Sequence, residues 1–91
     1  MKVAITGAKG MVGRALIAQL DPAKFEVTPL DLPDHDASKL DDLIAVTAGS
    51  DALIHLAWDP LRDNFSTNDI DPINDLMLFN AYKAAIVNKI P

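Results

Sequence analysis

The 91-residue sequence contains no cysteine, which excludes disulfides and thiolate metal sites. Basic residues are also few, because 8 Lys and Arg stand against 13 Asp and Glu. This acidic balance argues against nucleic acid or an acidic membrane as the main partner. No apolar run approaches the roughly 20 residues of a membrane span, and the first residues lack the pattern of a signal peptide. We therefore expect a cytoplasmic protein with neither nucleic-acid nor membrane partners.

Low-complexity sequence is absent as well, since the chain has only four glycines and six prolines. Hydrophobic residues make up 49%, which is enough to build a core and unlike a disordered segment. The length allows at most one small domain, so residues 1–91 are treated as one unit. We find neither an internal repeat nor a domain boundary.

Strand and helix patterns alternate along the chain. We expect strands at 2–6, 25–30 and 51–56, and helices at 11–20, 38–48 and 72–88. Alternation of this kind gives an α/β fold with a parallel sheet and helices on both faces. The segment 58–69 is polar and irregular.

The helix patterns predict which side chains face the core and where each helix begins. In the first helix the expected inner positions are Val12, Ala15, Leu16 and Leu20; in the second they are Leu40, Leu43, Ile44 and Thr47. Ser38 is the expected cap of the second helix, which Gly49 ends. Asp71 is the expected cap of the third helix, with Pro72 in its first turn. Apolar residues cover more than one face of this last helix, so we expect it to be covered on more than one side.

Three of the four glycines follow the first strand with the spacing Gly7-x-x-Gly10-x-x-Gly13. A strand that breaks into glycines and then begins a helix lets a pyrophosphate approach the backbone, where the first helical amides of Met11 and Val12 point at its charge. The alternative is that these glycines serve only a tight turn and close packing of the helix on the strand.

Asp31 stands at the end of the second strand, eighteen residues beyond Gly13. An acidic residue at about this distance accepts hydrogen bonds from the adenosine ribose in dinucleotide-binding folds, and its charge favours NAD over NADP. An ordinary strand-end aspartate is the alternative. Lys9 is the counter-signal, because a cation in the glycine loop could meet a 2′-phosphate; solvation is its simpler role.

Other candidate site residues follow the second and third strands. Asp36 could receive the adenine amino group or could cap a helix. Leu56, Ala57 and Trp58 lie beyond the third strand, at the edge where parallel sheets bind ligands, so that Ala57 could admit the cofactor and Trp58 could line a substrate pocket or merely cover the sheet. We expect no metal site, because the only histidines are a loop residue and a strand residue.

Together these residues resemble the extended short-chain dehydrogenase/reductase family, the NAD-dependent epimerase/dehydratase group. The resemblance rests on Thr6–Gly13, on Asp31 and on the run 49–57, which ends in His-Leu-Ala. Asn74 and Asn80 resemble the Asn-x-x-Gly-Thr-x-Asn helix of that family, although Met77 and Leu78 replace Gly-Thr and put the close approach of that helix in doubt. The stretch from Asp31 to Asp36 is shorter than usual in the family, so one small strand is missing.

The resemblance implies the N-terminal half of a Rossmann domain. In the family a catalytic Ser or Thr and a Tyr-x-x-x-Lys pair come later in the chain; here Tyr82 is followed four positions on by Ile86, so the catalytic residues stay unknown. We expect the front half of a longer oxidoreductase or epimerase, inactive by itself, that binds NAD and acts on a hydroxyl carbon of a sugar, sugar acid or nucleotide sugar. The loop 59–69 is the expected substrate contact, and the resemblance implies a homodimer. The alternative is a non-catalytic NAD(P)-binding regulatory or interaction module.

Overall fold

The computed structural model describes residues 1–59, 63–64, 69–70 and 72–91. In chain order the elements are β1 (Lys2–Thr6), α1 (Met11–Gln19), β2 (Glu26–Leu30), α2 (Leu40–Thr47), β3 (Ala52–His55), β4 (Asp63–Asn64), β5 (Asp69–Ile70) and α3 (Ile73–Val87). The predicted alternation of three strands and three helices is confirmed. The short antiparallel pair of β4 and β5 was not predicted, because two-residue strands carry too little pattern.

The main sheet has the strand order β2-β1-β3, and all its strands are parallel. Val3 of the central strand pairs with Val27 on one side and with Ala52 on the other, and Thr6 pairs with Leu30 and His55. Proline at position 29 is compatible with this order, because β2 is an edge strand and edge strands tolerate a missing backbone donor. All three strands therefore end at the same edge, where the loops that follow them meet.

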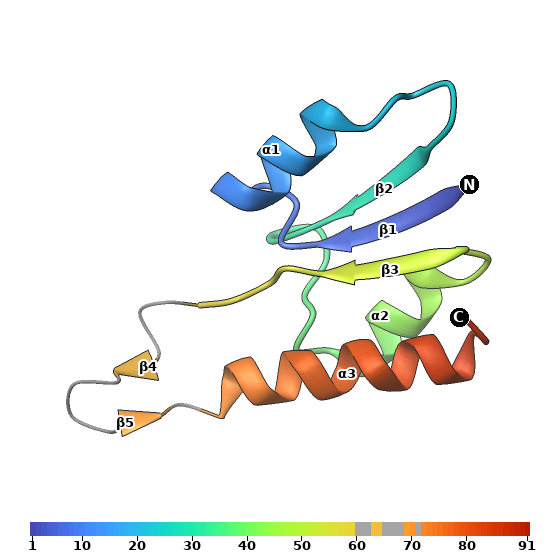
Figure 1. The fold of residues 1–91 in the computed structure, drawn as a ribbon. Coiled ribbons are helices and arrows are strands. Elements are labelled where there is room, and N and C mark those ends of the chain that lie inside the picture. Colours follow the sequence, from blue (N-terminus) through green and yellow to red (C-terminus); the bar gives the residue numbers. More distant parts are fainter. Residues whose placement is uncertain (60–62, 65–68, 71) are drawn as a thin grey trace.

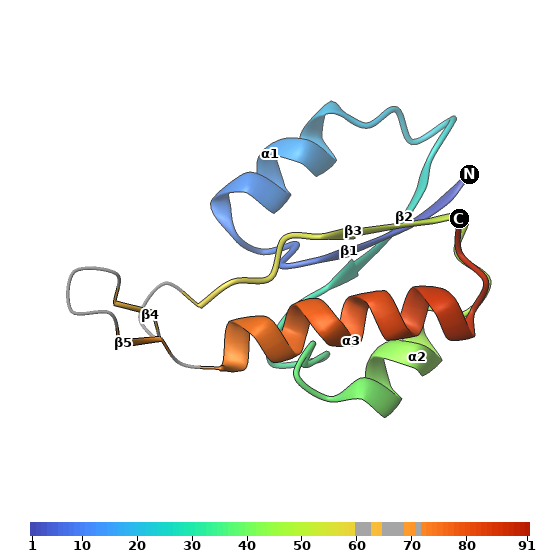
Figure 2. The same ribbon diagram turned by 60° about the horizontal axis from the view of Figure 1, so that its bottom comes forward.

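Helices cover both faces of the sheet, as predicted: α1 lies on one face, and α2 and α3 lie on the other (Figure 1; Figure 2). On the α1 side, Val3, Ile5 and Ala8 form a buried cluster against Leu16 and Ile17. On the opposite side the buried core residues are Ala4, Leu30, Leu43, Ala81 and Ala84. Leu40, Leu43, Ile44 and Thr47 face inward as predicted, and Gly49 follows α2 with a positive φ of 79°.

The predicted inner face of α1 is partly wrong. Val12 is 61% exposed and Ala15 is also exposed, whereas Gly13 is buried and Leu16, Ile17 and Leu20 pack against the sheet. The reason is the contact at Gly13, where the backbone of the helix lies directly against the preceding turn. This contact sets the rotation of the helix, and it turns Val12 outward.

The predicted helix starts also need correction. Ser38 does not cap α2; the N-cap residue is Lys39, and the Ser38 hydroxyl donates instead to Asp36 at 2.7 Å. Pro72 was predicted in the first helical position but is the N-cap residue of α3, so the helix begins one residue later than predicted, at Ile73; Asp71 lies outside the described residues. No helix among the described residues is long and apolar enough to cross a membrane.

Two asparagines fasten α3 to the loops on either side of it. Asn74 is 1% exposed; its Nδ2 donates to the Asp59 carbonyl at 3.0 Å, and its Oδ1 accepts the Asp59 amide at 2.7 Å. Asn80 is also buried and donates to the Ala37 carbonyl at 3.0 Å. The helix approaches the core through Ala81 and Ala84, so Met77 does not keep it away. The pair of asparagines thus positions both loops at the carboxyl edge of the sheet.

Candidate functional site

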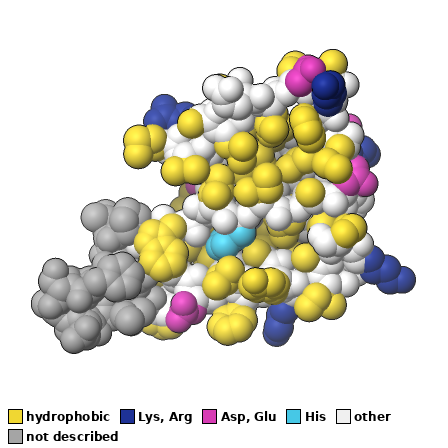
Figure 3. Space-filling view, viewed as in Figure 1, with side chains coloured by type: hydrophobic (Ala, Val, Ile, Leu, Met, Phe, Trp, Pro, Cys, Tyr) yellow, Lys and Arg dark blue, Asp and Glu magenta, His cyan; other side chains and the backbone are white. Residues whose placement is uncertain are grey.

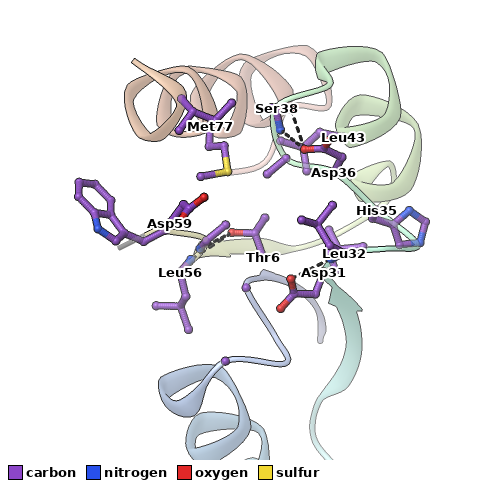
Figure 4. A pocket seen from close by; sticks show the side chains of 17 residues that line it. Thr6, Asp31, Leu32, His35, Asp36, Ser38, Leu43, Leu56, Asp59 and Met77 are labelled. Carbon is purple, nitrogen blue, oxygen red and sulfur yellow. Dashed lines mark hydrogen bonds between the residues drawn. The ribbon is translucent and has the colours of Figure 1, made fainter. Parts of the chain in front are cut away.

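A cavity of about 460 Å³ lies at the carboxyl ends of the three strands. Its size falls in the range of small-molecule and cofactor sites. Seven of the predicted site residues line it: Gly7, Gly10, Asp31, Asp36, Leu56, Ala57 and Trp58. Asp59, from the loop expected to contact a substrate, also lines it, together with residues that were not predicted as site residues: Thr6, Leu30, Leu32, His35, Ala37, Ser38, Leu43, Ile73 and Met77. Figure 4 shows Met77 and Leu43 on one side of the cavity, facing Thr6, Asp31 and Leu56 at the strand ends.

The glycine turn brings three backbone segments into contact. Gly7 has a φ of +69°, and a Cβ built there would lie 2.7 Å from the Ala57 nitrogen and from the Leu56 carbonyl carbon. A Cβ on Gly13 would lie 2.4 Å from the Gly7 oxygen. These two glycines are therefore required by backbone packing as well as by any ligand. At Gly7 and Gly13, therefore, close backbone packing and binding of a pyrophosphate do not exclude each other.

Gly10 differs from the other two glycines of the motif. It lines the cavity, its φ is −73°, and a Cβ on it would meet only the Gly7 oxygen, at 3.3 Å. Its amide donates to the Gly7 carbonyl at 3.1 Å, and no side chain caps the helix that begins at Met11. The first amides of a helix have no partner within the helix and carry its positive end. The bare turn at Gly10 and the uncapped start of α1 suit an anionic group such as a diphosphate.

Met11, Val12 and Gly13 lie outside the described lining of the cavity. The side chains of Met11 and Val12 are exposed on the first turn of α1, and Gly13 is buried against the turn. The predicted contact with a pyrophosphate involves only the backbone amides of Met11 and Val12, so the exposure of their side chains does not bear on it.

The Asp31 carboxylate bridges the glycine turn and the loop after β2. Its Oδ2 accepts the Lys9 amide at 2.8 Å, and its Oδ1 accepts the Leu32 amide at 2.8 Å. Each oxygen keeps a lone pair for another donor. The Lys9 ammonium lies 3.3 Å from the Leu32 carbonyl and 3.9 Å from Asp34, so this cation sits over the same loop.

Asp36 shapes the turn that precedes α2. Its Oδ1 accepts both the amide (2.9 Å) and the hydroxyl (2.7 Å) of Ser38. The hydroxyl hydrogen bond is the main reason that the pKa of Asp36 lies below its ordinary value, and the Ser38 amide adds to it. Asp36 does not cap α2, and its carboxylate, held ionised, lines the cavity where it could accept a donor from a ligand.

Trp58 and Asp59 also line the cavity, from the segment that leaves β3. Trp58 is 52% exposed, so it does not bury itself in the sheet edge. The loop expected to contact a substrate continues into residues 60–62 and 65–68, which lie outside the described residues. No group of three or more potential metal ligands occurs among the residues that the structure describes.

The buried polar residues Thr6 and Asn74 are the main features that sequence reasoning missed. Thr6 was placed at the end of a strand and at the start of the glycine motif, with no role for its side chain, but its hydroxyl accepts the amides of Leu56 and Ala57. Asn74 was noted in a helix motif, but its partner Asp59 could not be named, because these hydrogen bonds reach backbone atoms fifteen residues away. Both residues are polar and occupy positions that face the core. Since buried polar groups are nearly always hydrogen-bonded, this pattern could have indicated that each of them has a partner.

Comparison with known proteins finds similar solved structures. No protein-family model matches the sequence, and no curated protein sequence matches it. A uronate dehydrogenase from Agrobacterium tumefaciens, solved with NAD, is 24% identical, with a TM-score of 0.75 over 97% of this chain. A dTDP-4-dehydrorhamnose reductase from Bacillus anthracis, solved with NADP, is 22% identical, with a TM-score of 0.84 over 98%. A UDP-N-acetylglucosamine 4-epimerase from Bacillus cereus is 25% identical, with a TM-score of 0.72 over 99%.

The chain spans only about a third of the length of these enzymes: 37% of the dehydrogenase, 33% of the reductase and 32% of the epimerase. At these identities the likeness is one of fold, and the expected resemblance is confirmed at that level. The chain therefore has the Rossmann-like α/β fold of the N-terminal part of NAD-dependent epimerase/dehydratase-type enzymes.

Proposed function

We propose that residues 1–91 bind the adenosine and diphosphate parts of NAD in the cavity at the carboxyl edge of the sheet. The observation that carries this proposal is the bare turn at Gly10, which lines the cavity beside an uncapped helix start. The diphosphate would lie on this turn and on the amides of Met11 and Val12, with Gly7 and Gly13 holding the turn together. Asp31 would accept the ribose hydroxyls, and Asp36 the adenine amino group. Leu56, Ala57 and Trp58 would face the nicotinamide side.

The wider function that we propose is the cofactor-binding part of an oxidoreductase or epimerase acting on a hydroxyl carbon of a sugar, sugar acid or nucleotide sugar. It is supported by the similar solved enzymes, which act on compounds of these classes by name. The bound cofactor would supply the redox chemistry, and the protein would orient it. Tyr82 lines a different cavity, which favours a role for these 91 residues in binding and not in proton transfer.

Titration with NAD and NADP tests the cofactor assignment. We expect NAD to bind at least about tenfold more tightly than NADP, a difference of about 1.4 kcal/mol, because the Asp31 charge repels a 2′-phosphate. Asp31→Asn should lose most of this preference. Isothermal calorimetry with both cofactors measures it.

Asp41→Asn is the matched control, because it removes one exposed negative charge on α2 away from the cavity lining. It should keep the preference for NAD. No binding of NAD or AMP to the unmodified chain at millimolar concentration would end the proposal.

We also propose that a second copy of the chain covers α3. Six large hydrophobic side chains of this helix are exposed, among them Phe79 (64%) and Ile86 (74%). Figure 3 shows hydrophobic side chains gathered over α3 and the neighbouring edge of the sheet. Several large exposed apolar side chains on one helix are typical of a protein–protein contact.

Sedimentation velocity tests this contact. We expect the unmodified chain to sediment as a dimer at tens of micromolar, and Phe79→Glu with Ile86→Glu to sediment as a monomer, because two charges would lie in the apolar contact. Lys24→Glu, an exposed charge reversal in the segment between α1 and β2, on the α1 side of the sheet, should leave the dimer in place. A sharp monomer for the unmodified chain would contradict the proposal.

A further inference from the structure

The Thr6 hydroxyl uses all of its hydrogen-bonding capacity at the end of β1. Its oxygen accepts the Leu56 amide at 3.1 Å and the Ala57 amide at 3.2 Å, and it lies 2.7 Å from Nδ1 of His55. A hydroxyl has two lone pairs and one proton. Because two amides occupy the lone pairs, the proton must point at Nδ1 of His55. The imidazole is therefore the acceptor, and its own proton belongs on Nε2.

The peptide between Leu56 and Ala57 also touches the glycine turn. The missing side chain of Gly7 leaves room for this peptide, which a Cβ would approach to 2.7 Å. The Leu56 amide has a second acceptor in the Thr6 carbonyl at 3.1 Å, whereas the Ala57 amide contacts the Thr6 hydroxyl. The position of Ala57 beside the turn therefore depends on the Thr6 hydroxyl and, through its proton, on His55.

We propose that Thr6 and His55 are positioning residues for the dinucleotide site, and that they hold it in shape only while Nδ1 of His55 carries no proton. This inference rests on the proposed function. Protonation turns Nδ1 into a donor that faces an oxygen whose lone pairs are already in use. To accept from Nδ1, the hydroxyl must release one of the two amides. The Leu56 amide would keep the Thr6 carbonyl, whereas release of the Ala57 amide frees Ala57 from its place beside Gly7. Dinucleotide binding should weaken in acid for this reason.

The surroundings of His55 favour its neutral form. The imidazole lines a cavity of about 400 Å³ between β3 and α3, with Leu53, Leu78, Tyr82, Ile86 and other apolar residues. Tyr82 is the one other titratable side chain among the described residues of this lining, which includes no Asp, Glu, Lys or Arg. In the 91-residue chain the carboxylate of Pro91 is a further charged group at this cavity. On the Thr6 side, the titratable groups that line the site cavity are Asp31, His35, Asp36 and Asp59. Burial lowers the pKa of His55 below its ordinary value of 6.5.

The direction of the pH effect follows from this shift. A histidine whose pKa is lower in the folded chain than in the unfolded chain binds fewer protons when folded. Its contribution to stability is complete above pH 6.5 and is lost as the pH falls through the folded pKa. The hydrogen bond from the Ala57 amide to the Thr6 hydroxyl should be lost over the same pH range. We therefore expect cofactor affinity to be constant from pH 8 to 7 and to fall in acid.

Nitrogen NMR and NAD titration of the 91-residue chain between pH 8 and 5 test the inference. At pH 8 the His55 ring should be the Nε2–H tautomer. The Ala57 amide resonance should shift with the same midpoint as the His55 ring, below pH 6.5, and the Kd for NAD should rise at least tenfold through that midpoint. His55→Asn places a non-titrating amide oxygen near the position of Nδ1, so it should bind NAD at pH 8 and lose this acid dependence.

Two further variants separate positioning from general stability. Thr6→Ser keeps the hydroxyl and should keep the pH profile, whereas Thr6→Val should weaken NAD binding at every pH and uncouple the Ala57 amide from His55. His35→Asn removes the other histidine and should leave the step at the His55 midpoint. An Nδ1–H tautomer, an Ala57 amide indifferent to pH, or an unchanged acid dependence in His55→Asn would overturn the inference. Failure of NAD to bind at pH 8 would instead reject the proposed function, and the tautomer and amide measurements would still decide the contact itself.

Discussion

Gly13→Ala is expected to destabilise the chain by at least about 2 kcal/mol, a large part of the total stability of a domain of this size. The new Cβ would lie 2.4 Å from the Gly7 oxygen, 2.8 Å from the Ala8 Cα and 2.9 Å from the Ala8 carbonyl carbon. All three are backbone atoms, so no side chain can rotate away. Relief requires α1 to move off the sheet, which would open the cluster of Ile5, Leu16 and Ile17.

The sign of this effect makes the test informative. Gly13 lies inside α1, where alanine is ordinarily more favourable than glycine by about 1 kcal/mol. A loss of stability therefore has to overcome the helix propensity, and only the steric contact can supply it. Urea denaturation followed by circular dichroism measures the difference. A chain that becomes more stable would show that α1 does not approach the turn this closely.

The sequence was sufficient to predict the layers of the fold. The alternation of strand and helix patterns required a parallel sheet, and β1 has the bounds that its apolar run predicted. Gly49 ended α2 as expected, because its positive φ is one that glycine adopts readily. These features depend on local pattern and backbone preference, which a single sequence carries.

The rotation of α1 could not be predicted in the same way. Helical periodicity is read from the positions of apolar side chains. Gly13 has no side chain, so the pattern gives no sign that this position faces inward. Val12 was therefore placed inside, although Gly13 makes the close contact with the turn at Gly7 and Ala8, and Val12 is turned to the solvent. Ser38 was assigned as a cap because serine is a common N-cap residue. In the structure its hydroxyl donates a hydrogen bond to the nearby Asp36 carboxylate instead.

The sequence predicted which loops form the candidate site, but it did not predict the side-chain hydrogen bonds that fix those loops in place. Strand ends in a parallel sheet converge, so Gly10, Asp31 and Ala57 could be placed together from the order of elements. The hydrogen bonds of Thr6, Asn74 and Asn80 join segments 15 to 51 residues apart, and only the folded chain brings these partners within reach.

Gly10→Ala is expected to weaken NAD binding at least tenfold while changing the stability of the chain little. The added methyl group would meet only the Gly7 oxygen, at 3.3 Å, and the φ of −73° at this position suits alanine. The protein can therefore absorb the change within a few tenths of an ångström. A bound diphosphate cannot, because its oxygens would have to approach the same backbone that the methyl group now covers. Isothermal calorimetry with NAD and a thermal melt of the same sample measure the two effects.

Gly49→Ala provides the matched control, since it makes the same chemical change at a glycine outside the lining of the cavity. Nothing lies within 4 Å of its Cβ position, and its φ of +79° makes alanine unfavourable by about 1 kcal/mol. It should therefore lower stability and leave NAD affinity unchanged, the reverse of the result at Gly10. If Gly10→Ala bound NAD as tightly as the unmodified chain, the diphosphate could not lie on this turn. If both variants lost stability alike and neither lost affinity for NAD, Gly10 would serve the fold alone.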